Sequence, residues 1–181
     1  MSQEEPNGTL EFGSEPKAHA YTDGASGGSR GPGGYGAVLR WKGKTQEISG
    51  GEQNTTNQRL ELTAACVALK DRRGARSNRL LRLILPHQLH EEGLVQEVAG
   101  ERLAQPPWRV ANRDLWERLL EATKRHRQVR WRKVKGHSKT AGLHKSGNDR
   151  ADELAVAAKK EAIGARRTLL QGAGSSDGRG N

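Results

Sequence analysis

Three acidic residues stand beside apolar neighbours, where a charge needs compensation. Asp23 follows AHAYT and precedes a glycine, Glu61 lies between two leucines, and Asp152 lies in NDRADELA. A carboxylate against an apolar face is costly unless something offsets its charge. A divalent cation can offset several at once, since Mg²⁺ takes carboxylates, waters and phosphate oxygens as ligands. Two such ions clamp the attacking and leaving oxygens of a phosphodiester, so these residues indicate metal-assisted phosphodiester chemistry.

A second interpretation of the same residues stays open. Glu61 and Asp152 each fall in the first turns of an expected helix, where the helix dipole favours acidic side chains without any function. The spacing of Asp23, Glu61 and Asp152 along the chain does not by itself bring them together.

The elements expected to position these acids alternate between strands and helices. Apolar and β-branched runs predict strands over residues 18–23, 35–41, 44–49 and 128–134, with a hairpin turn at Lys42–Gly43. Helical spacing predicts helices over residues 55–70, 112–126 and 148–163, the first with a capping box of Thr55 and Gln58. Glycine-bearing loops are expected over residues 24–33 and 135–147. This order is typical of a mixed α/β domain.

Composition bounds the rest of the chain. Its 181 residues fit one domain over residues 18–163, with a flexible lead-in at 1–17 and a disordered Gly/Ser/Arg tail at 164–181. No apolar run is long enough to span a membrane, and no signal pattern opens the chain, so we expect a cytoplasmic protein. The single cysteine, Cys66, excludes a disulfide within the chain. A net charge of +10 favours nucleic acid as the partner over a merely solvated basic surface.

Several long strings resemble one family, the type 1 ribonucleases H. The similar strings are YTDGASGGSRGPGGYGAVL, TTNQRLELTAACVAL, VANRDLW, WRKVKGH and NDRADELA, in the order in which that family has them. They cover most of residues 18–162 except 71–109.

The resemblance implies a ribonuclease H-like α/β fold, a mixed five-stranded sheet flanked by helices. It implies hydrolysis of the RNA strand of RNA–DNA hybrids by a monomer, with Mg²⁺ as cofactor and Mn²⁺ as an alternative. Contacts to the 2′-OH distinguish RNA from DNA. Asp23, Glu61 and Asp152 would be three of four metal-binding carboxylates, and His137 a histidine that helps in proton transfer or product release. The residues expected to contact the hybrid are Gly24, Ser29, Thr56, Asn57 and Gln58.

This chain departs from the family at three of these places. Gln58 and Ser29 stand where many members have asparagine. The segment between His137 and Asp152 is longer than in the shortest members.

The middle of the chain lacks the family's fourth carboxylate, an aspartate in a pattern like YSDSxY. Translation in a frame shifted by one base, with permitted synonymous codons, lets residues 78–103 encode TVYSDSSYLINCMKKGWYKKWRANGW, which is similar to the missing segment. The absent aspartate then straddles the codons of Arg82 and Leu83. We therefore predict that residues 71–109, the fourth-strand region, are frameshifted, with one shift near residues 70–75 and a compensating one near 107–109.

This departure sets the expected activity. The run LLRLIL at residues 80–85 has the composition of a strand but brings no carboxylate. We expect little nuclease activity and poor folding of this chain, and full competence after the frame is restored. The alternative is a catalytically inactive relative that binds nucleic acid. A different nuclease or an integrase of the same fold is a weaker alternative, because such relatives share scattered acids rather than long strings.

Overall fold

The structure is a computed structural model that describes residues 18–28, 30–70, 80–85, 111–126, 128–133 and 143–173. Five strands form one sheet in the order β3-β2-β1-β4-β5. Their bounds are β1 Ala18–Ser26, β2 Gly31–Trp41, β3 Lys44–Thr55, β4 Leu80–Leu85 and β5 Gln128–Lys133. The pairs β1/β2 and β2/β3 are antiparallel, whereas β1/β4 and β4/β5 are parallel. The expected mixed five-stranded sheet is confirmed.

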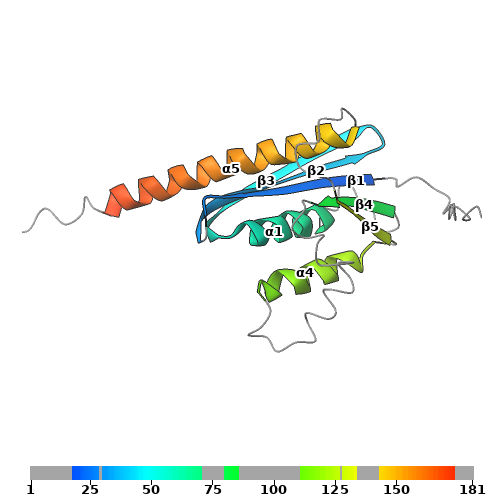
Figure 1. Cartoon of the computed structure of the whole chain (residues 1–181), viewed down its shortest axis with the longest axis horizontal. Helices are drawn as coiled ribbons and strands as arrows, with labels where there is room; N and C mark the ends of the chain where they lie inside the picture. The colour runs from blue at the N-terminus through cyan, green and yellow to red at the C-terminus, as the bar shows by residue number, and fades with distance from the viewer. Residues whose placement is uncertain are drawn as a thin grey trace, which may run out of the picture.

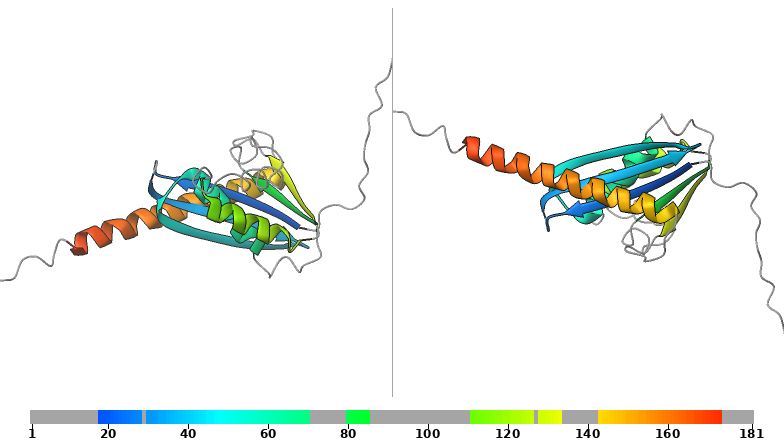
Figure 2. Two further views of the ribbon diagram at one scale, coloured as in Figure 1. Left: turned by 90° about the horizontal axis from the view of Figure 1, so that it is seen from below. Right: turned by 90° about the horizontal axis from the view of Figure 1, so that it is seen from above.

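Helices cover both faces of the sheet (Figures 1 and 2). Helix α5 (Leu143–Ala173) packs on β1, β2 and β3 from one side. Helix α1 (Asn57–Lys70) packs on β1 and β2 from the other side, and α4 (Arg113–Thr123) packs on α1. The C-terminal part of α5 extends beyond the ends of the strands (Figure 1).

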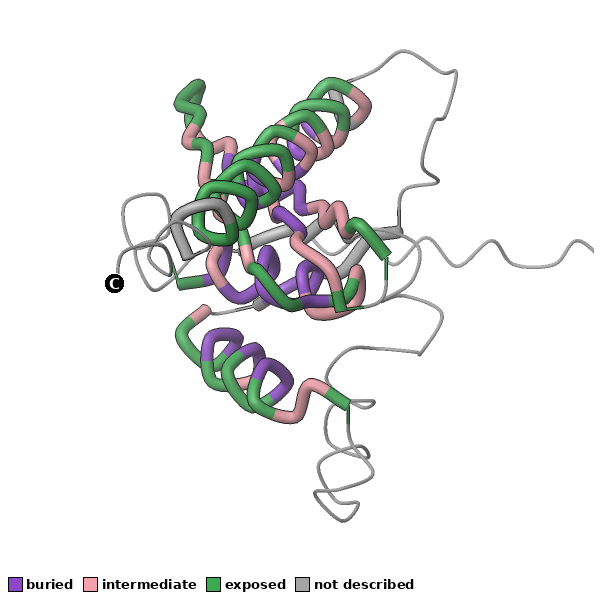
Figure 3. The backbone as a smooth tube through the Cα atoms, turned by 90° about the vertical axis from the view of Figure 1, so that its left-hand side faces the viewer, coloured by how far each residue is buried: buried purple, intermediate pink, exposed green. Residues whose placement is uncertain are grey.

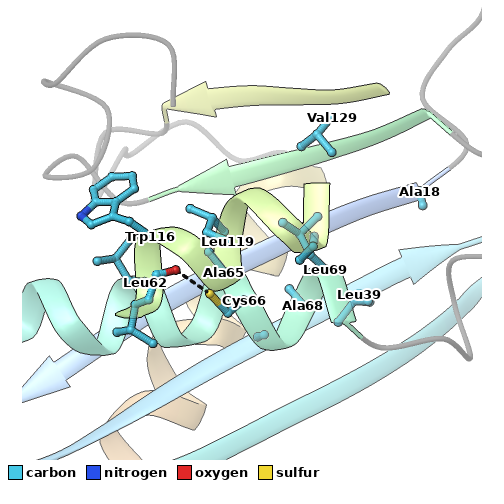
Figure 4. Close-up of a cluster of buried hydrophobic side chains, with 14 residues drawn as sticks. Ala18, Leu39, Leu62, Ala65, Cys66, Ala68, Leu69, Trp116, Leu119 and Val129 are labelled. Atoms are coloured by element: carbon cyan, nitrogen blue, oxygen red, sulfur yellow. Dashed lines mark hydrogen bonds between the residues drawn. The ribbon is translucent and has the colours of Figure 1, made fainter. Parts of the chain in front are cut away.

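The larger hydrophobic core lies between the sheet and the α1–α4 pair. Purple segments in Figure 3 mark the buried stretches that face one another there. Figure 4 shows the contact between the two helices, where the thiol of Cys66 donates to the carbonyl oxygen of Leu115 at 3.4 Å. Leu115, Leu119 and Ala122 of α4 are buried in this core. Burial of these apolar side chains, at about 25 cal/mol per Å², holds the helices on the sheet.

The β2–β3 turn is confirmed at Lys42–Gly43, where both residues have positive φ, 46° and 74°. This conformation matches the twist of a two-residue hairpin. The strands are longer than predicted, because residues 24–26 continue β1, 31–34 begin β2, and 50–55 extend β3. The prediction of a loop over residues 24–33 was therefore wrong at both ends. Glycines signal loops by composition, yet here Gly24, Gly33 and Gly34 pair across the sheet, with a register shift between Gly31 and Gly33.

Helix α1 begins two residues later than predicted, and its cap differs. Thr55 is the last residue of β3, and the Oγ1 of Thr56 accepts a hydrogen bond from the backbone N–H of Arg59 at 3.3 Å. Thr56 is thus the N-cap residue. The predicted capping box of Thr55 and Gln58 was wrong, because Gln58 instead accepts a hydrogen bond from Asn112 Nδ2 at 3.4 Å.

Helix α5 is longer than predicted at both ends. It begins at Leu143, inside the segment 135–147 that was expected to be a loop, and continues through Gly164 to Ala173. Residues 164–173 were expected in a disordered tail; alanine, arginine and leucine are strong helix formers, and together they outweigh the two glycines there. The lead-in at 1–17 and the end of the tail at 174–181 lie outside the described residues.

Strand β4 is the run LLRLIL, and its prediction as a strand is confirmed. It pairs with β1 on one side and β5 on the other, so the centre of the sheet is continuous. The rest of residues 71–110 lies outside the described part of the chain.

Ion pairs join the elements at the surface. Arg59 of α1 donates both terminal nitrogens to Asp114 of α4, at 3.2 and 3.0 Å, and its Nε lies 3.3 Å from Glu52 of β3. Arg150 of α5 makes a similar two-point contact with Glu47 of β3, at 2.8 Å to each oxygen. These pairs lower the pKa of Asp114 and of Glu47 through the guanidinium hydrogen bonds. None of the described helices is both long and apolar enough to cross a membrane.

Candidate active site

Asp23 lies just beyond the point where the parallel ladder of β1 and β4 ends. The last described pair of that ladder joins Tyr21 to Ile84, two residues before Asp23. On its other side Asp23 stays paired with Gly36 of β2. Ligand sites of α/β sheets form at the carboxyl ends of parallel strands, where neighbouring connections diverge. Asp23 was predicted to end the first strand, but β1 continues through it to Ser26.

Helix α1 brings Glu61 against the same stretch of β1. A Cβ atom at Gly24 would lie 2.8 Å from the Cβ of Leu60 and 2.9 Å from the backbone nitrogen of Glu61. A side chain at position 24 would push α1 off the strand, so the glycine permits the close approach. The backbone N–H of Gly24 also donates to Asp23 Oδ1 at 2.8 Å.

The carboxyl group of Glu61 is buried and incompletely compensated. Only 1% of the residue is exposed, and the pKa of its carboxyl group rises to about 7, because burial disfavours the charge and Asp23 adds negative charge nearby. Asn57 Nδ2 donates to its Oε1 at 2.8 Å, while its Oε2 is buried without a hydrogen-bond partner. Within the described part of the chain, no lysine, arginine or histidine pairs with it.

Asp152 reaches this region from the opposite face of the sheet. Gly36, the strand partner of Asp23, packs directly against α5, where an added Cβ would collide with the carbonyl oxygen of Ala151 and lie 2.7 Å from the Cβ of Leu154. Directly paired residues have Cα atoms about 5 Å apart. The backbone of α5 next to Asp152 is thus one strand away from Asp23.

The structure therefore brings Asp23 and Glu61 close enough to interact electrostatically and brings α5 at Asp152 alongside them. Among the described residues, no three Asp, Glu, His or Cys side chains gather tightly enough to hold one metal ion. The donor chemistry fits a hard cation, because oxygen ligands suit Mg²⁺ and the Oε2 of Glu61 lacks a partner.

The residues predicted to contact a hybrid fall into two groups. Gly24, Thr56, Asn57 and Gln58 lie around the start of α1, next to Glu61. Asn57 also orients the glutamate, a role that its position four residues before Glu61 could have indicated. The fifth expected contact, Ser29, lies outside the described residues, and so does His137, which was expected to help in proton transfer or product release.

Comparison with known proteins agrees with this fold and these residue types. The family model described as RNase H matches residues 15–160. The chain is 41% identical to the ribonuclease H of Maricaulis maris over 150 residues, covering 80% of this chain and 94% of that protein. It is 42% identical to the ribonuclease H of Methylococcus capsulatus over 147 residues, covering 78% and 88%.

A solved structure gives the same result for the fold. The structure of LC11-RNase H1 in complex with an RNA/DNA hybrid superposes with a TM-score of 0.61 at 23% identity, over 81% of this chain and 99% of that one. The chain belongs to the ribonuclease H family.

Proposed function

We propose that this chain is built to hydrolyse the RNA strand of RNA–DNA hybrids, with Asp23, Glu61 and Asp152 as ligands of divalent cations. The observation that carries the proposal is the buried Oε2 of Glu61, which lacks a partner beside a second carboxylate. A buried acceptor of this kind is costly unless a ligand satisfies it. Relatives that bear the name ribonuclease H support the choice of reaction.

Each residue has a proposed part in binding or chemistry. Mg²⁺, or Mn²⁺ in its place, supplies activation of the attacking water and offsets charge on the phosphate and leaving oxygen. Asn57 holds the Glu61 carboxylate in place through its 2.8 Å hydrogen bond. His137 helps to transfer a proton or release product.

We further propose that the substrate is positioned beside Glu61. Gly24, Ser29, Thr56, Asn57 and Gln58 contact the hybrid, and the excess of lysine and arginine holds both of its backbones. A monomer in the cytoplasm fits the lone, buried, free cysteine, which suits a reducing compartment.

A second candidate function is binding of hybrids without efficient cleavage. Strand β4 lies beside β1 in the sheet, and its sequence LLRLIL contains no carboxylate. A metal site near Asp23 would then have three carboxylate ligands, whereas the family has four. We therefore propose that cleavage by this exact chain is impaired, as a frameshift over residues 71–109 would cause.

Two versions of the chain separate these functions. In Mg²⁺, the chain as written should bind a labelled hybrid in a gel shift but cleave it slowly, and EDTA should stop the residual cleavage. A chain in which residues 78–103 read TVYSDSSYLINCMKKGWYKKWRANGW should cleave rapidly. Asp23→Asn in that chain should reduce cleavage by roughly two orders of magnitude or more, because lost metal ligands remove several kcal/mol of transition-state stabilisation. Full activity in the Asp23→Asn variant would contradict the assignment, and EDTA-resistant cleavage would exclude metal dependence.

A further inference from the structure

A basic cavity lies between the start of β2, the end of β3 and the C-terminal part of α5. Its volume is about 530 Å³. Its lining consists of two arginines, two amides and two leucines, namely Arg30, Arg166, Gln53, Asn54, Leu169 and Leu170. No carboxylate lines it. We propose that this cavity binds a backbone phosphate of a hybrid that extends beyond the catalytic carboxylates, an inference that rests on the proposed function.

The charge of the cavity suits a phosphodiester. In the described part of the chain, neither Arg30 nor Arg166 has an ion pair or a hydrogen bond to another residue, whereas Arg59 and Arg150 are both paired with carboxylates. A guanidinium donates two parallel hydrogen bonds to a phosphate, and it cannot accept one. Two unpaired guanidinium groups around one hollow form an anion site.

The framework around the cavity is held in place. Gln53 Nε2 of β3 donates to the carbonyl oxygen of Ala162 in α5 at 2.9 Å. Lys159 Nζ of the same helix donates to the carbonyl oxygen of Ser26, at the end of β1, at 2.8 Å. These two hydrogen bonds fix the base of the α5 overhang to the strand ends that carry Arg30 and Asn54.

Continuity with the expected hybrid surface favours a nucleic acid over a protein partner. Asn54 of the cavity is followed by buried Thr55 and then by Thr56, the cap of α1 and an expected hybrid contact. The exposed Leu169 and Leu170, at 70% and 68%, border the cavity and offer apolar contact to sugars. A nucleic acid carries phosphates along its whole length, so one molecule can contact both the cavity and the hybrid surface around Thr56.

The distance to the carboxylates sets the length of hybrid that this requires. Arg166 lies about 21 Å along α5 from Asp152, at 1.5 Å per residue. Along β2, Gly31 lies about 17 Å from Gly36, the partner of Asp23, at 3.3 Å per residue. At 3.4 Å per base pair, this separation spans about five or six base pairs. A short hybrid centred on the carboxylates would not reach the cavity.

The experiment compares hybrids of about 8 and about 20 base pairs by fluorescence anisotropy in EDTA, which prevents cleavage, over a series of salt concentrations. The variant Arg30→Asn/Arg166→Ala removes two exposed charges from the cavity, with asparagine chosen at position 30 because Arg30 has positive φ. The control Lys42→Asn/Lys44→Ala removes two exposed charges at the opposite end of the β2–β3 hairpin, with asparagine chosen because Lys42 has positive φ. Circular dichroism checks that both variants are folded.

The cavity variant should bind the long hybrid about tenfold more weakly, with the salt slope reduced by about one because one phosphate contact is lost, and the short hybrid nearly as the unaltered chain does. The control should leave both affinities near those of the unaltered chain. Equal losses at both lengths, or no loss at either, would overturn the inference; the second result is the one expected if the cavity serves an acidic protein. If the unaltered chain binds neither hybrid, the proposed function fails with it.

Discussion

Glu61 combines properties that conflict in a metal-free protein. Its carboxyl group is buried and close to Asp23, and one oxygen has no partner. Ionising such a group costs stability, yet a metal ligand has to be ionised. On the proposed metal assignment, a bound cation would remove this conflict, and the residue would then favour the metal-loaded state over the metal-free one.

This conflict predicts how stability depends on pH. The pKa of Glu61 is about 7 in the folded chain and near 4.5 when unfolded. Because the pKa is raised on folding, the neutral carboxyl group contributes to the free energy of unfolding in full below pH 4.5. This contribution, about 3 kcal/mol, is lost as the pH rises through 7. Glu61→Gln keeps the oxygen that Asn57 contacts and never ionises. In EDTA at pH 8, we expect this variant to unfold at higher denaturant concentration than the unaltered chain.

Two controls accompany that measurement. At pH 4.5 the two chains should unfold nearly together, because Glu61 is then neutral in the folded chain and only half ionised in the unfolded one. Added Mg²⁺ should stabilise only the chain with glutamate, since a ligand stabilises the folded state that binds it. A Glu61→Gln variant that is less stable than the unaltered chain at pH 8 in EDTA would refute the description of this carboxyl group.

Cys66 lies between α1 and α4, and its reactivity should report on their contact. Only 3% of the residue is exposed, and burial raises the pKa of its thiol to about 11. The thiolate is the reactive form. A thiol-specific reagent at pH 8 should therefore label the folded chain slowly and the denatured chain at once. Rapid labelling without denaturant would show that α4 does not stay packed on α1.

At the scale of elements, the close approach of α5 to the sheet decides where Asp152 lies. Gly34 and Gly36 lie directly under the backbone of α5, and either Cβ would collide with it. Strings such as GPGGYG therefore serve packing as well as turns. Helix α1 packs on β1 at Gly24, whereas α5 packs on β2 at Gly36, the strand partner of Asp23.

The variant Gly36→Ala should separate α5 from β2 at the level of Asp152. We expect a loss of about 1 to 3 kcal/mol in the free energy of unfolding, because the helix backbone has to move to admit the methyl group. Metal affinity should fall as Asp152 moves away from Asp23. Chemical denaturation and metal titration by calorimetry measure the two effects, and unchanged values for both would contradict the packing.

Gly164→Ala is the matched control on the same helix. An added Cβ there meets nothing within 4 Å. Alanine favours the helix over glycine by about 1 kcal/mol, so helicity measured by circular dichroism should rise. A fall in helicity would show that α5 does not continue past residue 163.

At the scale of the molecule, the alternation of strands and helices was predictable, because the spacing of apolar residues and the residue types found in turns are local properties of the sequence. The strand at Leu80–Leu85 was also predictable from its apolar composition, but an apolar run without alternation does not specify register. In the structure, Arg82 pairs with His19 and Leu83 with Ala20, short of Asp23.

Other features depended on contacts that are remote in sequence. Gly24, Gly33 and Gly34 resembled parts of a loop because the helices they pack against, α1 and α5, are distant along the chain. The similarity of the sequence strings predicted Asp23, Glu61 and Asp152 as metal ligands. The electrostatic interaction between Asp23 and Glu61 could be found only from the fold. The basic cavity beneath the α5 overhang had no sequence signal strong enough to find it, whereas the position of Asn57 four residues before Glu61 could have indicated its contact with that glutamate.

The central claim is that acids from β1, α1 and α5 share divalent cations. Anomalous X-ray scattering from a crystal of the restored-frame chain soaked in Mn²⁺ tests it most directly. We expect manganese density bonded to the carboxylate oxygens of Asp23 and Glu61, with Asp152 at the same cluster, and no density in a crystal of the Asp23→Asn variant. Manganese bound elsewhere, with these three carboxylates left without metal, would contradict the account.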